Sequence, residues 1–370
     1  MISRIFNINF QGEVFIIVDN TNVERWEMKP YFMNADTAPY TYRVIVVEPK
    51  TPWKLNPEML VKKNSHGVDE NVIRKRKDKF LPVNPLYYAW FLSPLDSQIL
   101  LAKTNELFKV LYENCQEFKS NFAAYSSMLN FGSAENYYNR DMFNSGDRNI
   151  LHCTAKFFGF SKPQKNKTSP RKNSKTTKDS VSESEYSENV QENLGHVQKL
   201  KVIGYFFTEH TVGCRIELSD EQQKLYDQEE DFHSLKKRQF GSTTKSPTKK
   251  LKENSNAEGV EKGVSTSLGV TNVDLKYENS KQRFYPIPGR GKRAHITLGT
   301  AKGARAVNTG IDLLDIVLAE KNANEVANNN KPFEMKLESC KAVVRHYKPN
   351  FWVVYPEEGI LMDSMFTGHY

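Results

Sequence analysis

Two short tripeptides carry the residue types that could do chemistry in this chain. His152-Cys153-Thr154 and His295-Ile296-Thr297 each place an imidazole and a hydroxyl two positions apart in an apolar run typical of a β-strand. Side chains alternate between the two faces of a strand, so each histidine and its threonine point the same way. Two such strands would bring together two imidazoles and two hydroxyls. One imidazole can act as base and the other as acid while the hydroxyls hold phosphate oxygens, which suits phosphodiester cleavage without a metal.

A single His-x-Thr is weak evidence. A lone histidine in an apolar strand is more often a core residue whose hydrogen bonds are satisfied. Two copies in strand-like runs, at 151–160 and 294–298, leave the active-site and core interpretations evenly balanced. The residues that flank the two copies then decide between them.

The flanking sequences, LHCTAKF at 151–157 and RAHITLG at 293–299, resemble the two signature strands of 2H phosphoesterases. Within that superfamily they are most similar to the myelin 2′,3′-cyclic-nucleotide 3′-phosphodiesterase family. The resemblance extends over TVGCRIELS at 211–219, VNTGIDLLDI at 307–316 and FTGHY at 366–370. It implies hydrolysis of nucleoside 2′,3′-cyclic phosphates, free or at RNA 3′ ends, to 2′-phosphates, with no metal and no cofactor. The implied catalytic residues are His152, Thr154, His295 and Thr297.

Substrate contacts outside the tripeptides also follow from the resemblance. Phe157 matches an aromatic residue that stacks on the base, Tyr87 a tyrosine near the cleft entrance, and Val307 a residue that lines the base site. Arg293 shares a strand face with His295 and is expected to attract the phosphate. The alternatives are core packing for Phe157 and Val307, and a surface salt bridge for Arg293. The sequence does not indicate which histidine is the acid and which is the base.

The chain has 370 residues, a formal net charge of +8 and a pI of about 9.0, and its length suits two domains. A basic balance favours polyanionic partners such as RNA, although charge carried by disordered inserts would only aid solubility. Four cysteines without a CxxC pair indicate a reducing compartment rather than a disulfide framework or a zinc site. With no signal peptide, apolar spanning run or prenylation box, we expect a cytoplasmic protein. Peripheral membrane or cytoskeletal association is implied by the resemblance alone.

Residues 1–130 are expected to form an α/β domain. Apolar runs at 14–19 and 42–47 predict buried parallel strands, and residues 24–33 and the segment after Asn56-Pro57 predict helices. Residues 97–122 predict one long amphipathic helix. VVEPKTPW at 46–53 is similar to the P-loop-kinase-like domain that precedes the phosphoesterase in the family. The GxxxxGK[ST] phosphate loop is absent, so we expect a truncated kinase-like domain without kinase activity, in which Asp19 is structural.

Residues 150–370 are expected to form the phosphoesterase domain. The resemblance implies an α+β fold with two lobes of antiparallel sheet, each contributing one His-x-Thr strand. Strands are predicted at 199–207, 213–218, 333–344 and 351–354, and helices at 220–230 and 304–325. Two polar inserts, near 161–198 and 232–282, contain too few apolar residues to offset the entropy of ordering, and are predicted to be disordered.

The leading hypothesis is therefore a metal-independent phosphodiesterase that acts on cyclic nucleotides or RNA ends. An alternative from another class is an RNA-binding or cytoskeletal scaffold that keeps the fold without meaningful turnover. A third hypothesis, an RNA-repair kinase fused to a phosphodiesterase, would need a phosphate loop. The sequence does not indicate the oligomeric state.

Overall fold

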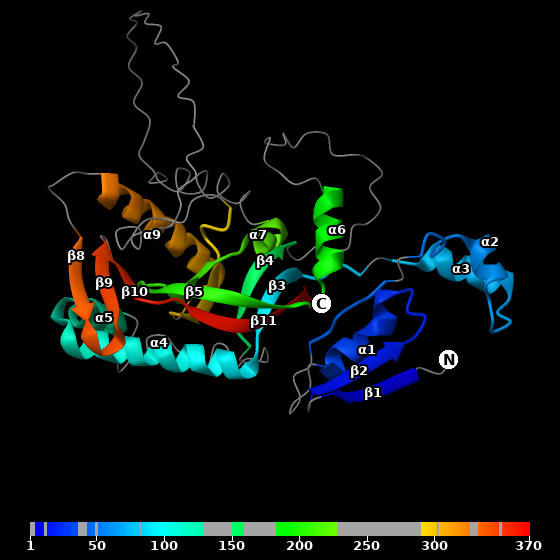
Figure 1. The fold of residues 1–370 in the computed structure, drawn as a ribbon, viewed down its shortest axis with the longest axis horizontal. Coiled ribbons are helices and arrows are strands. Elements are labelled where there is room, and N and C mark those ends of the chain that lie inside the picture. Colours follow the sequence, from blue (N-terminus) through cyan, green and yellow to red (C-terminus); the bar gives the residue numbers. More distant parts are fainter. Residues whose placement is uncertain are drawn as a thin grey trace, which may run out of the picture.

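The structure is a computed structural model. It describes residues 4–10, 13–35, 43–48, 51–81, 83–128, 150–158, 183–227, 290–301, 303–325, 332–347 and 350–370. Most of these residues belong to a sheet covered by helices, and the N-terminal elements form a smaller unit beside it (Figure 1).

Nine strands of the described residues form one sheet, in which neighbouring strands are antiparallel. β5 pairs with β6 on one side and with both β10 and β11 on the other, so the strands from β11 round to β5 close into a barrel-like ring. The two expected lobes are therefore parts of one continuous sheet. Its strands, in sheet order, are β11 (Ile360–His369), β3 (Tyr87–Leu92), β4 (His152–Phe157), β7 (His295–Thr300), β6 (Thr211–Glu217), β5 (Val197–Phe207), β10 (Phe351–Pro356), β9 (Ala342–Tyr347) and β8 (Phe333–Leu337).

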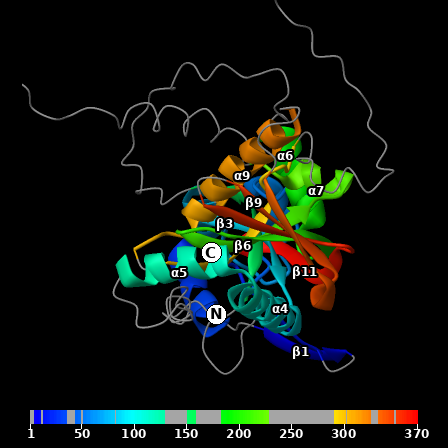
Figure 2. The ribbon, with the colours of Figure 1, turned by 90° about the vertical axis from the view of Figure 1, so that its left-hand side faces the viewer.

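The two faces of the sheet pack against different helices. Helices α4 (Pro94–Asn114) and α9 (Val307–Glu325) lie on opposite faces in both views (Figures 1 and 2). On the α4 face, Leu107 belongs to the large core that also contains Cys153 and Ile296. On the α9 face, Leu313 packs in a smaller cluster with residues of β5, β9 and β10. Because side chains alternate between the two faces of a strand, each strand residue faces either the α4 side or the α9 side of the sheet.

Buried polar contacts fix α9 to its face of the sheet. Arg215 of β6 donates two hydrogen bonds to the Glu320 carboxylate, at 2.8 and 3.0 Å, and the Tyr355 hydroxyl donates a third at 2.7 Å. Glu320 is fully buried. Two turns earlier on the helix, the hydroxyls of Thr208 and Thr211 each donate to the Asp312 carboxylate at 2.6 Å. The first half of α9 is therefore held at a defined height above β6 and β7.

The N-terminal unit differs from the predicted parallel sheet. Its strands β1 (Arg4–Phe10) and β2 (Glu13–Asp19) form an antiparallel pair, and Ile16 and Ile17 are 45% and 48% exposed. The prediction of a buried parallel strand at 14–19 is wrong, because the run pairs with the segment before it and a two-stranded sheet cannot cover both faces. The prediction of a second buried strand at 42–47 is also wrong for the described residues, since 43–48 form no strand and pair with no other strand. Their carbonyl at Val44 accepts a hydrogen bond from the Thr367 side chain of β11 instead.

The two predicted helices of this unit are present as α1 (Arg25–Ala35) and α2 (Pro57–Lys62). A third helix, α3 (Glu70–Lys79), was not predicted. The Asn56 side chain accepts a hydrogen bond from the Met59 amide at 3.1 Å, as expected of a helix cap. A P-loop-kinase-like fold is not confirmed by these elements.

One expectation at the join of the two parts needs correction. The predicted helix at 97–122 is two helices, α4 and α5 (Gln116–Met128), because the backbone at Cys115 is extended. β3 was not predicted, and it lies inside the ring. Residues of β3, α4 and α5 pack in the same core as those of β4 and the later strands.

The second part matches most predicted elements. β5, β6, β10 and α9 are confirmed. The helix expected at 220–230 is present as α7 (Asp220–Leu225) but is shorter, because the backbone at Tyr226 is extended. The predicted strand at 333–344 is instead the hairpin β8–β9, which turns through a short 3₁₀ helix at Glu338–Cys340. Helix α6 (Glu183–Asn193) and the start of β5 lie within the insert expected to be disordered at 161–198. The insert expected at 232–282 lies outside the described residues.

The buried Arg215–Glu320 pair gives a prediction about stability. Glu320→Gln should lower the free energy of unfolding by roughly 3–5 kcal/mol, because it leaves the Arg215 charge buried without its counter-ion. Glu70→Gln, in the exposed pair with Arg74, should cost less than about 1 kcal/mol. Urea denaturation of the two variants measures the difference, and similar losses would contradict the special role of the buried pair.

Candidate active site

The two His-x-Thr strands, β4 and β7, are neighbours in the sheet. Their one ladder pair is Cys153 opposite Ile296, and both residues are fully buried on the α4 face. Because side chains alternate, the residues on either side of this pair point to the α9 face. The structure therefore brings His152, Thr154, His295 and Thr297 together on one face, and all four are partly exposed.

The antiparallel register crosses the two tripeptides. With Cys153 opposite Ile296, His152 lies opposite Thr297 and Thr154 lies opposite His295. Each imidazole thus has a hydroxyl across the strand pair as well as one two residues along its own strand. The two imidazoles stand at diagonal corners, where they can approach an atom between them from opposite sides.

Both imidazoles bond a backbone carbonyl two residues before them in the chain. His295 Nδ1 donates to the carbonyl of Arg293 at 2.8 Å, and the His152 ring bonds the backbone of Ile150. A carbonyl only accepts, so Nδ1 of His295 carries a proton. In the neutral form this leaves the Nε2 lone pair of His295 as the basic atom.

Burial lowers the pKa of both histidines to about 4. The surrounding protein removes water that would stabilise the charged imidazolium, and nearby cations add to this effect. For His152 these are His369, Arg43 and His295, and for His295 the cation is Arg293. At neutral pH both rings are therefore uncharged unless an anion lies beside them.

The first turns of α9 touch the second tripeptide directly. The Thr297 hydroxyl donates to the Thr309 hydroxyl at 2.9 Å. A Cβ placed on Gly310 would lie 3.0 Å from Cε1 of His295, so the absence of a side chain lets the helix approach the ring. Gly213 of β6 has the same effect on Thr309, whose methyl group would lie 2.8 Å from a Cβ there. These close contacts hold His295 and Thr297 from the α9 side of the sheet.

The first tripeptide has aromatic neighbours instead. The Tyr87 ring stacks on His152 with centroids 5.1 Å apart, and on its other side lies His369, at 4.9 Å. Phe91 also packs against His152, with centroids 5.2 Å apart. Tyr87 is thus enclosed between two imidazoles, and His369 of β11 joins the site as a third histidine.

The other residues implied by the resemblance lie around this group. Phe157 is 53% exposed at the end of β4, with its ring 6.4 Å from that of Tyr87, and Val307 is 63% exposed at the start of α9. Core packing is therefore ruled out as the reason for either residue. Arg293 is only 6% exposed, which rules out a surface salt bridge, and its carbonyl orients His295.

Sequence reasoning missed four residues near the site: Arg43, Thr309, Gly310 and His369. The Thr367-x-His369 spacing on β11 is the reverse of the His-x-Thr pattern and could have pointed to His369. Thr309 and Gly310 lie within the matched run at 307–316. Arg43 has no signal in the sequence, since its place depends on how distant segments pack.

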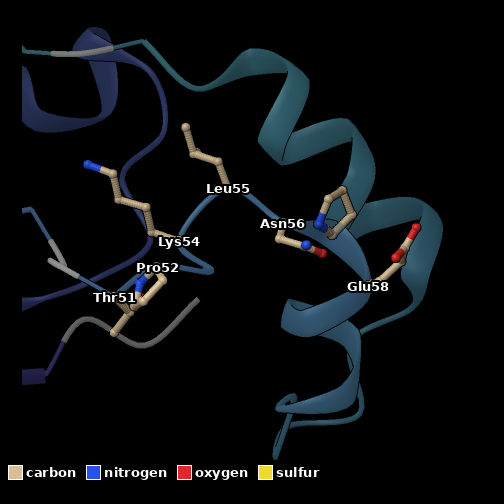
Figure 3. Close-up of a pocket in the computed structure, with 7 residues that line it drawn as sticks. Thr51, Pro52, Lys54, Leu55, Asn56 and Glu58 are labelled. Carbon is tan, nitrogen blue, oxygen red and sulfur yellow. The ribbon is translucent and has the colours of Figure 1, made fainter.

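A hollow lined by residues 51–52 and 54–58 lies in the N-terminal unit (Figure 3). It contains none of the candidate site residues. Within the described part of the chain, no group of three or more histidine, cysteine, aspartate or glutamate side chains is arranged to hold a metal ion. Likewise, no helix in the described ranges is both long enough and apolar enough to cross a bilayer. The four cysteines are free thiols.

The sequence matches a family model described as 2′,3′-cyclic nucleotide 3′-phosphodiesterase over residues 84–243 and 268–370. Curated proteins named 2′,3′-cyclic-nucleotide 3′-phosphodiesterase are similar along 96% of the chain. Those of Pongo abelii, Mus musculus and Rattus norvegicus are 27%, 26% and 25% identical, and the matches cover 66%, 67% and 67% of their lengths. The chain thus spans about two thirds of the length of these relatives.

The lowered histidine pKa values predict a pH-dependent stability. Between pH 6.5 and about 4 the unfolded chain binds protons at His152 and His295 that the folded chain does not, so the free energy of unfolding should fall as the pH is lowered through this window. Urea denaturation at pH 7 and pH 4.5 measures the fall. It should be smaller in His152→Gln and His295→Gln and unchanged in His66→Gln, which alters an exposed histidine. An equal fall in all four proteins would contradict the lowered pKa values of the two site histidines.

Proposed function

Because the chain belongs to the 2′,3′-cyclic nucleotide 3′-phosphodiesterase family, we propose that it hydrolyses nucleoside 2′,3′-cyclic phosphates, free or at RNA 3′ ends, to 2′-phosphates. The observation that supports this most is the direct pairing of the two His-x-Thr strands, with both imidazoles and both hydroxyls on one face. The proposed reaction is metal-independent acid–base catalysis by His152 and His295.

In the proposed reaction, water attacks the phosphorus in line with the bond to the ribose 3′ oxygen. One imidazole accepts the water proton at Nε2 while the other, protonated, donates to the departing 3′ oxygen. The bond that forms is from phosphorus to the water oxygen, and the one that breaks is to the 3′ oxygen, which leaves the phosphate on the 2′ position. The two histidines then differ by one proton from their starting states, and exchange with solvent restores them.

The two threonines have a supporting role in this proposal. The hydroxyls of Thr154 and Thr297 donate to the non-bridging phosphate oxygens, whose negative charge grows as the water oxygen bonds. Loss of one such donor typically costs a few kcal/mol of transition-state stabilisation. Without substrate the Thr297 hydroxyl donates to Thr309. When the phosphate binds, the Thr297 proton would turn towards it, and the Thr309 hydroxyl would donate to the Thr297 oxygen instead.

The negative charge of the substrate helps to keep one imidazole protonated, so that this imidazole can act as the acid. Free imidazoles with pKa values of about 4 are rarely protonated at neutral pH. A cyclic phosphate is an anion, and an anion beside two imidazoles raises the pKa of both. Arg293 and the aromatic residues Tyr87 and Phe157 would bind the phosphate and the base, and Val307 would line the base site.

A direct test of the proposal is hydrolysis of 2′,3′-cyclic AMP in EDTA, with identification of the product isomer. We expect turnover to the 2′-phosphate, reduced about 10²- to 10⁴-fold in His152→Ala and in His295→Ala, because each removes a proton-transfer group. His66→Ala, outside the site, should retain full activity. No turnover by folded wild-type protein would overturn the proposal and favour an RNA-binding or cytoskeletal scaffold.

The pH profiles of kcat/KM and kcat should differ. The first reports groups in the free enzyme and the second groups in the substrate complex. Because both free histidines have pKa values of about 4 and the bound anion raises them, the optimum of kcat/KM should lie at lower pH than that of kcat. Steady-state kinetics from pH 4.5 to 8.5 on the same substrate measure both profiles, and coincident optima would contradict the expected role of the substrate charge.

A further inference from the structure

The segment 43–48 of the N-terminal unit lies against the site face of the sheet. The Thr367 hydroxyl of β11 donates to the carbonyl of Val44 at 2.8 Å, and Thr367 is fully buried. Thr367 and His369 point to the same side of β11, since they are two residues apart. Farther along, Tyr370 bonds the backbone of Val46 and its ring stacks on Phe32 of α1, with centroids 5.2 Å apart. The segment is therefore held at the edge of the ring that carries the site.

This anchoring places a cation over the aromatic part of the site. The guanidinium carbon of Arg43 lies 4.8 Å from the centre of the Phe91 ring. Phe91 is 4% exposed and packs in turn against the His152 ring, with centroids 5.2 Å apart. Stacking uses the flat face of a guanidinium, whose N–H donors point outwards in its plane. Arg43 is thus fixed beside the first histidine.

The strand order shows on which side of the histidines Arg43 stands. Phe91 belongs to β3, His152 to β4 and His295 to β7, and these strands are consecutive in the sheet. A phosphate held between the two imidazoles lies over the seam between β4 and β7. Phe91, on which the Arg43 guanidinium packs, lies on the far side of His152 from that seam. An anion bound by Arg43 would therefore be a second group, next to the phosphate at the seam.

We propose that Arg43 binds the phosphodiester on the 5′ side of the terminal nucleotide when the substrate is an RNA end with a 2′,3′-cyclic phosphate. The inference rests on the proposed function and adds a substrate preference to it. A guanidinium donates two parallel hydrogen bonds to a phosphate, and such charge-assisted pairs are among the stronger ones. A cyclic mononucleotide has no such phosphodiester, so Arg43 would favour RNA ends over free cyclic nucleotides.

Arg43 lies outside the residues that match the family model, which begin at residue 84. The N-terminal unit would therefore contribute a substrate contact to a site whose two histidines lie in the matched region. Its charge also contributes to the lowered pKa of His152, which is consistent with a position close to the ring.

The test compares two substrates on the full chain: 2′,3′-cyclic AMP, and the dinucleotide ApA ending in a 2′,3′-cyclic phosphate. Arg43→Gln should lower kcat/KM for the dinucleotide about 10- to 100-fold more than kcat/KM for the mononucleotide, which is the effect of one lost charge-assisted contact. The change with the mononucleotide reports only the loss of the Arg43 charge beside His152. Arg43→Lys should recover part of the loss, because it keeps the charge without the fork. Lys29→Gln removes an exposed positive charge from the same unit and should affect neither substrate.

A second variant tests the anchoring. Thr367→Val keeps Arg43 but removes the hydrogen bond to the Val44 carbonyl. It should lower kcat/KM by less than Arg43→Gln does, and again more for the dinucleotide than for the mononucleotide. Equal losses on both substrates in Arg43→Gln, or no loss on either, would overturn the assignment.

Equilibrium binding of the two products separates this inference from the proposed function. ApA 2′-phosphate should bind Arg43→Gln more weakly than wild type, while adenosine 2′-phosphate should bind both equally, whether or not the protein has turnover. Absence of turnover with this difference in binding would reject the proposed hydrolysis and keep the role of Arg43. Turnover without this difference in binding would support the proposed hydrolysis and reject the role of Arg43.

Discussion

The opposition of Cys153 and Ile296 is the contact on which the site depends. It joins the two His-x-Thr strands directly, and the pairing of β11 with β5 closes the ring on its far side. A slip of one residue between β4 and β7 would change which groups oppose each other, and a strand turned over would bury its imidazole in the α4 core. The full burial of Cys153 and Ile296 therefore specifies the orientation of the two histidines, because large apolar contacts on one face hold the polar groups on the other.

Helix α9 adds a second constraint from above the sheet. Its contacts with Arg215, Thr208 and Thr211 are buried and polar, so any displacement would leave a charged or hydroxyl group without its partner. Such contacts add little net stability but penalise alternative positions strongly. Glycines at 213 and 310 then allow the helix backbone to come close enough for Thr309 to reach Thr297. The position of one catalytic candidate thus depends on polar groups that lie within about three helical turns of Thr309 along α9.

The sequence predicted the local geometry of the site better than its surroundings. Alternation along a strand is a property of the strand itself, so the shared face of His152 and Thr154 followed from their spacing. The direct pairing of β4 with β7 and the ring closure are non-local and had no signal. The aromatic strand Tyr87–Leu92 was missed as a strand although it supplies the ring that stacks on His152. At 14–19 an apolar run was taken for a buried parallel strand, because apolar content alone does not distinguish one from a hairpin strand.

The ring stacking around Tyr87 has a consequence for spectroscopy. A proton held over the face of an aromatic ring is shielded by the ring current, so the imidazole resonances of His152 and His369 are displaced from ordinary histidine positions. His346 is displaced in the same way by Trp352, whose ring lies 4.0 Å away and nearly parallel. His295, which lies beneath Gly310, has no aromatic ring stacked on it in the described part of the chain. The two catalytic candidates thus differ from each other in their ring-current environment, so nuclear magnetic resonance can follow the protonation of His152 and of His295 as separate signals.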